Sequence, residues 1–241
     1  VPFVDEFYLF YFFQDLQYVV FWETNGKEIH DYPKSYVRNE PFYFKEGITW
    51  SANLHRTQLS HLWSFKRFPF RKLPKGCIFG MGAQGIIIEN DLWAILAICS
   101  SKLIFTASRL ISQDNKQGTG STAILPIALK RAKELGRLKN LSSLAQEAHD
   151  IIQEWATGDE ASTLFIKPWI LQIKEFNPDE KPNTYHPYSK TFEYKSWPSL
   201  IHMRKIFNEN KSLTNLLDSC EKRVIYLNSR LNEILDEIDS E

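Results

Sequence analysis

The stretch Asn39–Ser51, NEPFYFKEGITWS, constrains the fold of this chain more than any other. Three consecutive aromatic residues, Phe42 to Phe44, precede a charged pair and Gly47. Glycine adopts backbone conformations that other residues resist, and the residues from Ile48 to Trp50 are of types that favour β-strands. The stretch therefore predicts a strand, a tight turn at Gly47 and the start of a second strand.

A second glycine-rich stretch, CIFGMGAQGIII, spans residues 77–88 and contains the pattern Gly-x-Gly-x-x-Gly from Gly80 to Gly85. A dinucleotide site needs a helix directly after these glycines and an acidic residue about 20 positions later. The β-branched run from Ile86 to Ile88 favours a strand instead, and no Asp or Glu occurs between Leu92 and Gln113. We therefore predict a glycine-rich hairpin whose backbone lies close to a partner, with a nucleotide site as the alternative.

Helical periodicity begins after this stretch. Asp91 is placed to cap a helix that begins at Leu92 with the sequence LWAILAICSSKLIFTASRLIS. This apolar run is too short for a membrane span, and two cations interrupt it. A later amphipathic helix is predicted after a cap at Ser142 or Ser143. In the last helix, apolar residues from Val224 to Ile238 recur at steps of three and four, which is typical of packing on a partner helix.

Strands followed by helices predict an α+β fold. Residues 1–137 are expected to form a mixed β-sheet with packed helices, and residues 138–241 a helical C-terminal region. A chain of 241 residues with 43% hydrophobic content is large enough to bury a core. Its three cysteines lack the spacing of a zinc site or a disulfide framework, which predicts a reduced, cytoplasmic environment. The start at Val1, in a phenylalanine-rich segment, predicts a piece of a longer protein.

The net charge is zero, but the charged residues are unevenly distributed. Residues 42–75 hold seven Lys/Arg and one acid, and residues 101–140 hold eight Lys/Arg and two acids. Residues 1–31 contain six acids and one lysine, and residues 218–241 contain seven acids and three bases. These blocks predict one basic face with acidic ends elsewhere. Cations interleaved with aromatic residues suit a surface that neutralises phosphates and reaches bases, although a solvated basic loop is equally compatible with them.

The sequence supplies three sets of candidate nucleic-acid contacts. The phosphate candidates come from the segment FKRFPFRKLPK and are Lys66, Arg67, Arg71, Lys72 and Lys75. The candidates for contacts with base edges in a groove are Thr49, Trp50, Ser51, His55, Arg56 and Gln58. A second contact strip consists of Lys102, Arg109, Gln113, Lys116 and Thr119, and Lys45 and Gln84 complete the set.

Two other classes of function stay open on the residues alone. The first is a protein-interaction module, because the acidic C-terminal helix is suited to dock a partner. The second is a complete small enzyme. The six histidines are scattered, however, and no Ser-His-Asp, metal-ligand or nuclease constellation stands out.

Three segments carry a resemblance to a known family: FYFKEGITWS at Phe42–Ser51, PKGCIF at Pro74–Phe79 and LAICSSK at Leu96–Lys102. They resemble the large adenine-specific DNA methyltransferases of phage-exclusion systems (the PglX type) and related fused restriction-modification enzymes. The later strings QEAHDIIQEWATGDEAS and LNSRLNEI also look similar, so the resemblance covers most of the chain.

The resemblance implies a target-recognition region that reads a short sequence in double-stranded DNA and lies C-terminal to a catalytic domain. The chain lacks the Asn-Pro-Pro-Tyr motif that places the target adenine in that family, and the nearest string is Asn177-Pro178-Asp179-Glu180. Methyl transfer from S-adenosylmethionine would therefore belong to a catalytic domain that precedes this segment, with no cofactor, metal or catalytic residue here. Other defence-system proteins are further expected partners, and a membrane is not.

Overall fold

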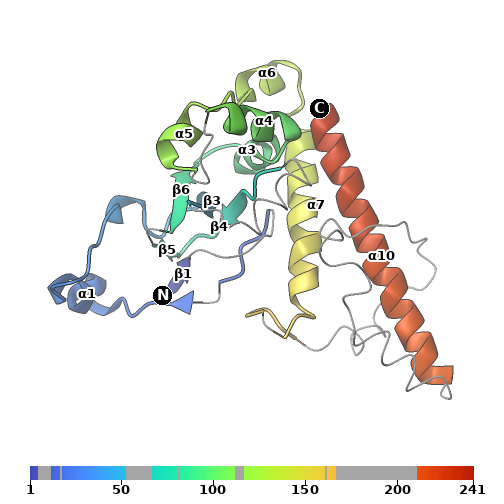
Figure 1. Cartoon of the computed structure of the whole chain (residues 1–241), viewed down its shortest axis with the longest axis horizontal. Coiled ribbons are helices and arrows are strands. Elements are labelled where there is room, and N and C mark those ends of the chain that lie inside the picture. Colours follow the sequence, from blue (N-terminus) through green and yellow to red (C-terminus); the bar gives the residue numbers. More distant parts are fainter. Residues whose placement is uncertain are drawn as a thin grey trace.

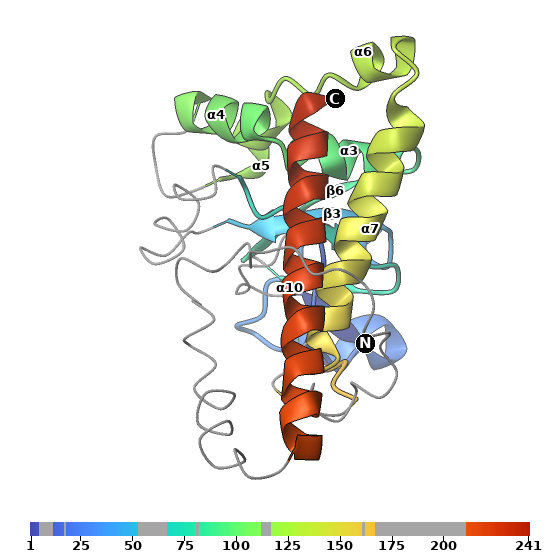
Figure 2. The same cartoon turned by 90° about the vertical axis from the view of Figure 1, so that its right-hand side faces the viewer.

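The computed structural model describes residues 1–4, 12–16, 18–52, 67–80, 82–111, 117–160, 162–166 and 211–241. The architecture is α+β, as the sequence predicts. Small sheets pack against a group of short helices, and two long helices run side by side along one flank (Figures 1 and 2).

The described strands form two three-stranded sheets. The first has the order β2 (Tyr18–Val19), β1 (Pro2–Val4) and β5 (Ile78–Phe79), in which β1 is antiparallel to β2 and parallel to β5. The second has the order β4 (Arg71–Leu73), β3 (Gly47–Ser51) and β6 (Ala83–Ile87), in which β3 is antiparallel to both neighbours. β3 is the central strand of the second sheet, and all five of its residues are buried.

Short helical elements surround the sheets. The early ones are η1 (Glu23–Gly26), α1 (Lys27–Asp31) and η2 (Glu40–Phe42). After β6 come α3 (Leu92–Cys99), α4 (Lys102–Ile111), α5 (Thr119–Ala123) and α6 (Leu129–Glu134). The two long helices are α7 (Leu138–Ala156) and α10 (Lys211–Ser240).

The helices α7 and α10 pack against each other in antiparallel orientation, which Figure 2 shows along their length. Arg223 pairs with Glu154 at 2.9 Å. Arg230, about two turns further along the same face of α10, pairs with Glu147 at 2.6 Å. The buried seam on α10 contains the apolar residues that were expected to pack on a partner helix: Val224, Leu227, Leu231, Leu235 and Ile238. That prediction is confirmed, and the partner helix is α7 of the same chain.

One large core cluster joins the second sheet to the helices. It contains Trp50 from β3, Leu96 from α3, Ala148 from α7 and Leu231 from α10. Full burial of a leucine side chain such as that of Leu96 or Leu231 stabilises the folded state by about 1.5–3 kcal/mol. The cluster therefore draws on both of the predicted regions, 1–137 and 138–241, and the division between them stays a prediction.

The turn near Phe42 differs from the sequence prediction. Phe42 belongs to the short helix η2 instead of a strand, and the turn is made at Phe44, whose φ is 63°. Gly47 already lies in β3, where it pairs with Ile87 of β6 and Leu73 of β4. Glycine is needed here because a Cβ at residue 47 would overlap the carbonyl oxygen of Ile86. The prediction of the second strand is confirmed. Gly47 is required by the close approach of β6 to β3, however, and not by a turn.

The stretch Gly80–Gly85 is not a hairpin. Its two flanking strands, β5 and β6, belong to different sheets, so the segment connects the sheets. A strand follows the glycines, as the β-branched run predicts, and the dinucleotide pattern therefore lacks its helix. A Cβ at Gly80 would lie 2.7 Å from the ring of Phe3, which shows that this glycine packs against the chain's own side chain.

The helix predicted from Leu92 is interrupted at Ser100 and Ser101. It forms α3 and α4, which are bent by 66° to each other. Ser101 caps the start of α4, because its hydroxyl oxygen accepts a hydrogen bond from the backbone N–H of Ile104 at 3.3 Å. In the described part of the chain, no single helix has the length and apolarity of a membrane span, although α3 and α4 together reach them.

Two predicted helix caps are wrong. The helix α3 begins at Leu92 as expected, but Asp91 adopts a left-handed conformation (φ 56°) and makes no side-chain cap hydrogen bond. The helix α7 begins at Leu138, so that Ser142 and Ser143 lie inside it. Here the preceding Gly136, with φ +70°, supplies the change of chain direction between α6 and α7.

Candidate nucleic-acid interface

The base-contact candidates of β3 face the interior. Trp50 is fully buried, and its Nε1–H donates a hydrogen bond to the carbonyl oxygen of Gln117 at 2.7 Å. The hydroxyl of Thr49 donates to the carbonyl oxygen of Gln84 at 2.8 Å, and Ser51 is also buried. These residues hold the sheet together and fix the segment before α5. Their burial leaves no surface for base contact, which removes them from the candidate set.

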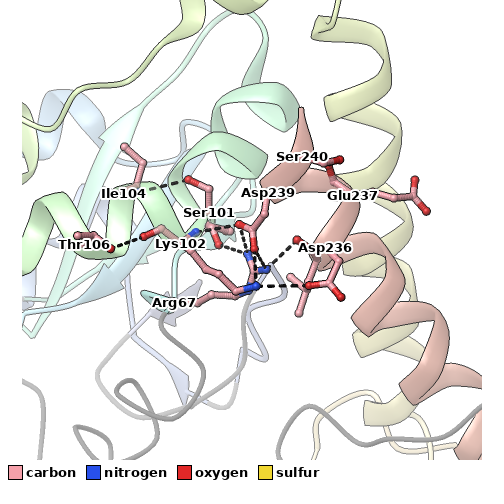
Figure 3. A network of polar contacts seen from close by, with 11 residues as sticks. Arg67, Ser101, Lys102, Ile104, Thr106, Asp236, Glu237, Asp239 and Ser240 are labelled. Atoms are coloured by element: carbon pink, nitrogen blue, oxygen red, sulfur yellow. Dashed lines mark hydrogen bonds and ion pairs between the residues drawn. The ribbon is translucent and has the colours of Figure 1, made fainter.

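Arg67 is also buried, with 3% of its surface exposed. One guanidinium nitrogen donates to the carbonyl oxygen of Ser100 at 2.8 Å, and another donates to that of Leu235 at 2.7 Å. The same guanidinium forms an ion pair with the carboxylate of Asp239 at 2.6 Å (Figure 3). Arg67 thus joins the segment before β4, the break between α3 and α4, and the end of α10. Because it is buried and paired inside the protein, Arg67 is also excluded as a phosphate contact.

Lys102 shares Asp239 with Arg67, as Figure 3 shows. Its backbone N–H donates to this carboxylate at 2.9 Å, and its ammonium group lies 2.9 Å from it and 3.4 Å from Asp236. The hydrogen bond to Asp239 is the main cause that raises the pKa of Lys102. Lys102 is exposed, but its charge is largely balanced by the acidic end of α10.

Two further cations of the basic segment are turned inward. Arg71 of β4 is fully buried. Lys72 is paired with Glu46 at 2.8 Å, and its ammonium group lies 5.0 Å from the ring centroid of Trp93. Burial removes Arg71 from the candidate set, and Lys72 keeps only a partly exposed, neutralised ammonium group.

The second contact strip is partly on the surface. Arg109 is half-buried over the ring of Phe68 at 5.8 Å and donates a hydrogen bond to the side-chain oxygen of Gln117 at 3.3 Å. Burial lowers the pKa of its guanidinium. Thr119 is exposed at the start of α5, and Gln84 is half-buried in β6.

The phosphate candidate Lys75 and the further contact candidate Lys45 are exposed, with no ion-pair partner among the described residues. Their backbones are neighbours because the N–H of Phe44 donates to the carbonyl of Cys77 at 2.9 Å, and that of Gly76 donates to Phe44 at 3.1 Å. Phe42 and Phe44 beside them are 49% and 40% exposed. We call this group the Lys45–Lys75 turn. It combines unpaired cations with accessible rings.

Six candidates lie outside the described residues, so the structure does not place them: His55, Arg56, Gln58, Lys66, Gln113 and Lys116. In the described ranges, no group of three or more His, Cys, Asp or Glu side chains is arranged to hold a metal ion.

Two groups that the sequence marks only by their net charge become prominent in the structure. The first is the acidic end of α10, where Asp239 neutralises Arg67 and Lys102. No local pattern reveals this pairing, because it joins positions 172 residues apart. The second is a set of exposed lysines at the end of α6 and the start of α7, which the string LKRAKELGRLK would have revealed.

A groove of about 460 Å³ lies between α7 and α10. Its lining mixes acidic and basic side chains, including the Arg223–Glu154 and Arg230–Glu147 pairs. Since each of these cations is already paired, the groove does not offer an anion site.

Comparison with known proteins gives one informative similarity. In an alignment of 202 positions that covers 81% of this chain, the sequence is 26% identical to the adenine-specific methyltransferase BrxX of Escherichia coli O9:H4 (strain HS). The aligned part spans 15% of the length of that protein. No protein-family model matches the sequence. The similarity supports a relationship between this chain and a methyltransferase.

Proposed function

We propose that this chain is a DNA-contacting recognition region of an adenine-N6 DNA methyltransferase in a restriction-modification or phage-defence system. The observation that carries the proposal is the similarity to the adenine-specific methyltransferase BrxX, which extends over 202 residues. Because the aligned part spans only 15% of that protein, the catalytic domain is assigned to another part of the polypeptide. The proposed role places the chain in the cytoplasm with its DNA.

The Lys45–Lys75 turn supports this proposal. Unpaired ammonium groups gain affinity for DNA by releasing the counterions that surround phosphates. The neighbouring exposed rings of Phe42 and Phe44 offer flat apolar surface next to these charges. Among the described residues, and apart from the inward-turned Lys72, the proposed contact set keeps the candidates that are not fully buried and reach the surface: Lys45, Lys75, Lys102, Arg109, Thr119 and Gln84. It also retains His55, Arg56, Gln58, Lys66, Gln113 and Lys116.

S-adenosylmethionine is expected in the complete enzyme, and the glycine-rich segment of this chain does not fit it. A cofactor loop needs open backbone at its glycines, whereas Gly80 is closed off by the ring of Phe3. The strand β6 follows the segment in place of a helix whose N-terminus would face a ligand. We therefore assign neither cofactor binding nor methyl transfer to these residues.

The test is a fluorescence anisotropy titration of the 241-residue chain with a labelled DNA duplex at several salt concentrations. The proposal expects the logarithm of the binding constant to fall linearly with the logarithm of salt concentration, with a slope of about −0.9 for each phosphate contacted. Absence of duplex binding, or an affinity that does not respond to salt, would contradict it.

A second candidate function is docking of another protein of a defence complex, and one observation favours it. The segment 18–46 exposes several large aromatic side chains, among them Phe21 (54%), Tyr32 (58%) and Tyr36 (64%). The guanidinium of Arg38 lies 4.0 Å from the ring centroid of Tyr36. Exposed aromatic and arginine side chains are enriched in protein interfaces. A chain that ignores DNA but co-purifies with a defined protein partner, and loses that partner in Tyr32→Ser/Tyr36→Ser, would favour this candidate.

A further inference from the structure

The exposed lysines around the junction of α6 and α7 form a basic surface that the proposed function has not yet used. We call residues 129–140 the α6–α7 corner. It contains five cations, Lys130, Arg131, Lys133, Arg137 and Lys139, and one acid, Glu134. The corner therefore has a surplus of positive charge that is concentrated in one short segment.

Two of the five cations already have acidic partners. Arg131 pairs with Glu134 at 3.6 Å, and Arg137 pairs with the side chain of Glu241 at 2.7 Å. In the part of the chain that the structure describes, no acid pairs with the other three, which are the exposed Lys130, Lys133 and Lys139. Lys130 and Lys133 are three positions apart on α6, so they are neighbours on its surface. Like charges at this spacing repel each other, and a bound polyanion would relieve the repulsion.

The backbone that carries these lysines is fixed by the core. Ala132 is buried, and α6 contacts both α3 and α7. The backbone N–H of Gly136 donates to the carbonyl of Lys133 at 3.0 Å, and that of Arg137 donates to Ala132 at 2.9 Å. These bonds close the turn in one geometry. The lysine stems therefore project from a fixed base, and only their side chains need to be ordered when a ligand binds.

The surroundings of the corner set its chemical preference. It has no exposed aromatic residue to stack on a base, and its neighbouring exposed apolar residue is Leu135. Lysine ammonium groups contact phosphates as point charges and carry no base information. A repeating phosphate backbone matches several separate charges on one short segment better than a single small anion does.

We propose that the α6–α7 corner binds the phosphate backbone of duplex DNA through Lys130, Lys133 and Lys139. The contact anchors the duplex without regard to its sequence, while other residues read the bases. This inference rests on the proposed function and adds to it a phosphate-binding surface that lies outside the earlier candidate set. Glu241, which neutralises Arg137, marks the acidic boundary of the surface.

The experiment compares three variants of the 241-residue chain in the same anisotropy titration. The corner variant is Lys130→Gln/Lys133→Gln/Lys139→Gln. The matched control removes three exposed lysines elsewhere and is Lys27→Gln/Lys34→Gln/Lys222→Gln, which has the same net charge. The third variant keeps the corner charge with Lys130→Arg/Lys133→Arg/Lys139→Arg. Circular dichroism melting checks that all variants fold, as expected for exposed positions.

The expected result is a loss of affinity of about tenfold or more for the corner variant near 0.1 M salt, and a salt slope that is shallower by about 2.7, or 0.9 for each of three contacts. The control and the arginine variant should keep the slope of the wild type. Equal losses in the corner and control variants would show a net-charge effect and overturn this inference while the proposed function stands. Failure of the wild type to bind duplex DNA would overturn both.

Discussion

The two basic blocks of this chain have the same net charge of +6 in the sequence but opposite fates in the structure. In residues 42–75, Arg67 and Arg71 are buried and Lys72 is paired with Glu46. In residues 101–140, the lysines of the α6–α7 corner stay exposed. The first block holds the cations predicted to contact phosphates, whereas the described residues of the second block hold more exposed cations without an acidic partner.

The difference follows from the neighbours of each cation. Arg67 and Arg71 are interleaved with Phe68, Phe70 and Leu73, all of which are fully buried. The segment that buries these residues, which ends in β4, brings the arginines into the interior, where carbonyl oxygens and Asp239 satisfy Arg67. In the α6–α7 corner, the buried side chain of α6 is the small Ala132, and the lysines around it reach water. In this protein, the cations that alternate with aromatic residues belong to the core, whereas the cations of the α6–α7 corner, which has no aromatic residue, lie on the surface.

The largest expected effect is a loss of stability that tests whether residues 42–75 contribute to the protein interior through Trp50. Trp50→Ala should destabilise the folded state by about 3–5 kcal/mol, because a fully buried indole is replaced by a cavity and the carbonyl of Gln117 loses its donor. Urea unfolding followed by circular dichroism measures this change. Trp50→Phe is the control, since it keeps most of the ring and should cost less. Unchanged stability together with weaker DNA binding would instead place Trp50 on the surface.

A smaller loss of stability is expected at the ion pair that holds the first block to α10. Asp239→Asn leaves Arg67 with carbonyl oxygens but no counter-charge, which should cost about 2–3 kcal/mol. Asp236→Asn is the matched control, because its carboxylate is 76% exposed and, among the described residues, pairs with Lys102 alone, at 3.4 Å. An exposed pair of this kind contributes about 0–1 kcal/mol. Equal unfolding free energies for the two variants would contradict the buried role of Arg67.

Much of the fold followed from residue type and periodicity. The strand at Ile48 to Trp50 and the strand that contains Ile86 and Ile87 were predictable from β-favouring residue types, and the apolar seam of α10 from its repeat of three and four. The break between α3 and α4 was not, because it depends on a hydroxyl cap at Ser101 and on the distant Asp239. Local propensity does not contain such tertiary contacts.

The candidate site was less predictable than the fold. Residue type identified cations and polar groups correctly as hydrogen-bonding residues, but it did not say whether their partners are DNA or this protein. Thr49 and Arg67 satisfy their donors on backbone carbonyls of Gln84 and Ser100. Those partners lie 35 and 33 positions away, so only the fold reveals them.

The exposed remainder of the first block gives the next prediction. Lys45→Glu/Lys75→Glu should weaken duplex binding about tenfold and make the salt slope shallower by about 1.8, because two phosphate contacts are lost. Anisotropy measures the affinity, and the melting temperature should stay the same since both side chains are exposed. Lys34→Glu/Lys222→Glu is the control with the same change of charge. If the two double variants bind alike, the Lys45–Lys75 turn is not part of the interface, and the second block alone carries the contact.

The smallest expected effect concerns Lys72, which the structure turns toward His149. His149 packs between the rings of Phe13 and Trp93, with centroids 5.4 and 5.2 Å away. Burial lowers the pKa of His149 from its ordinary value of 6.5, the charge of Lys72 adds to this, and Asp150 opposes it. Because folding favours the neutral ring, its contribution to stability is complete above pH 6.5 and is lost as the pH falls through the lowered pKa.

Removing the charge at position 72 should therefore raise the pKa of His149 toward its ordinary value, so that less stability is lost in acid and the loss is complete at a higher pH. An NMR titration of the imidazole in Lys72→Met measures the pKa directly, and urea unfolding between pH 7 and 5 measures the stability. Lys75→Met is the control, because Lys75 is exposed and does not act on this ring. A pKa of His149 that is identical in both variants would mean that Lys72 extends into solvent. The first block would then present one more cation to DNA. Its number of exposed cations would be closer to that of the α6–α7 corner.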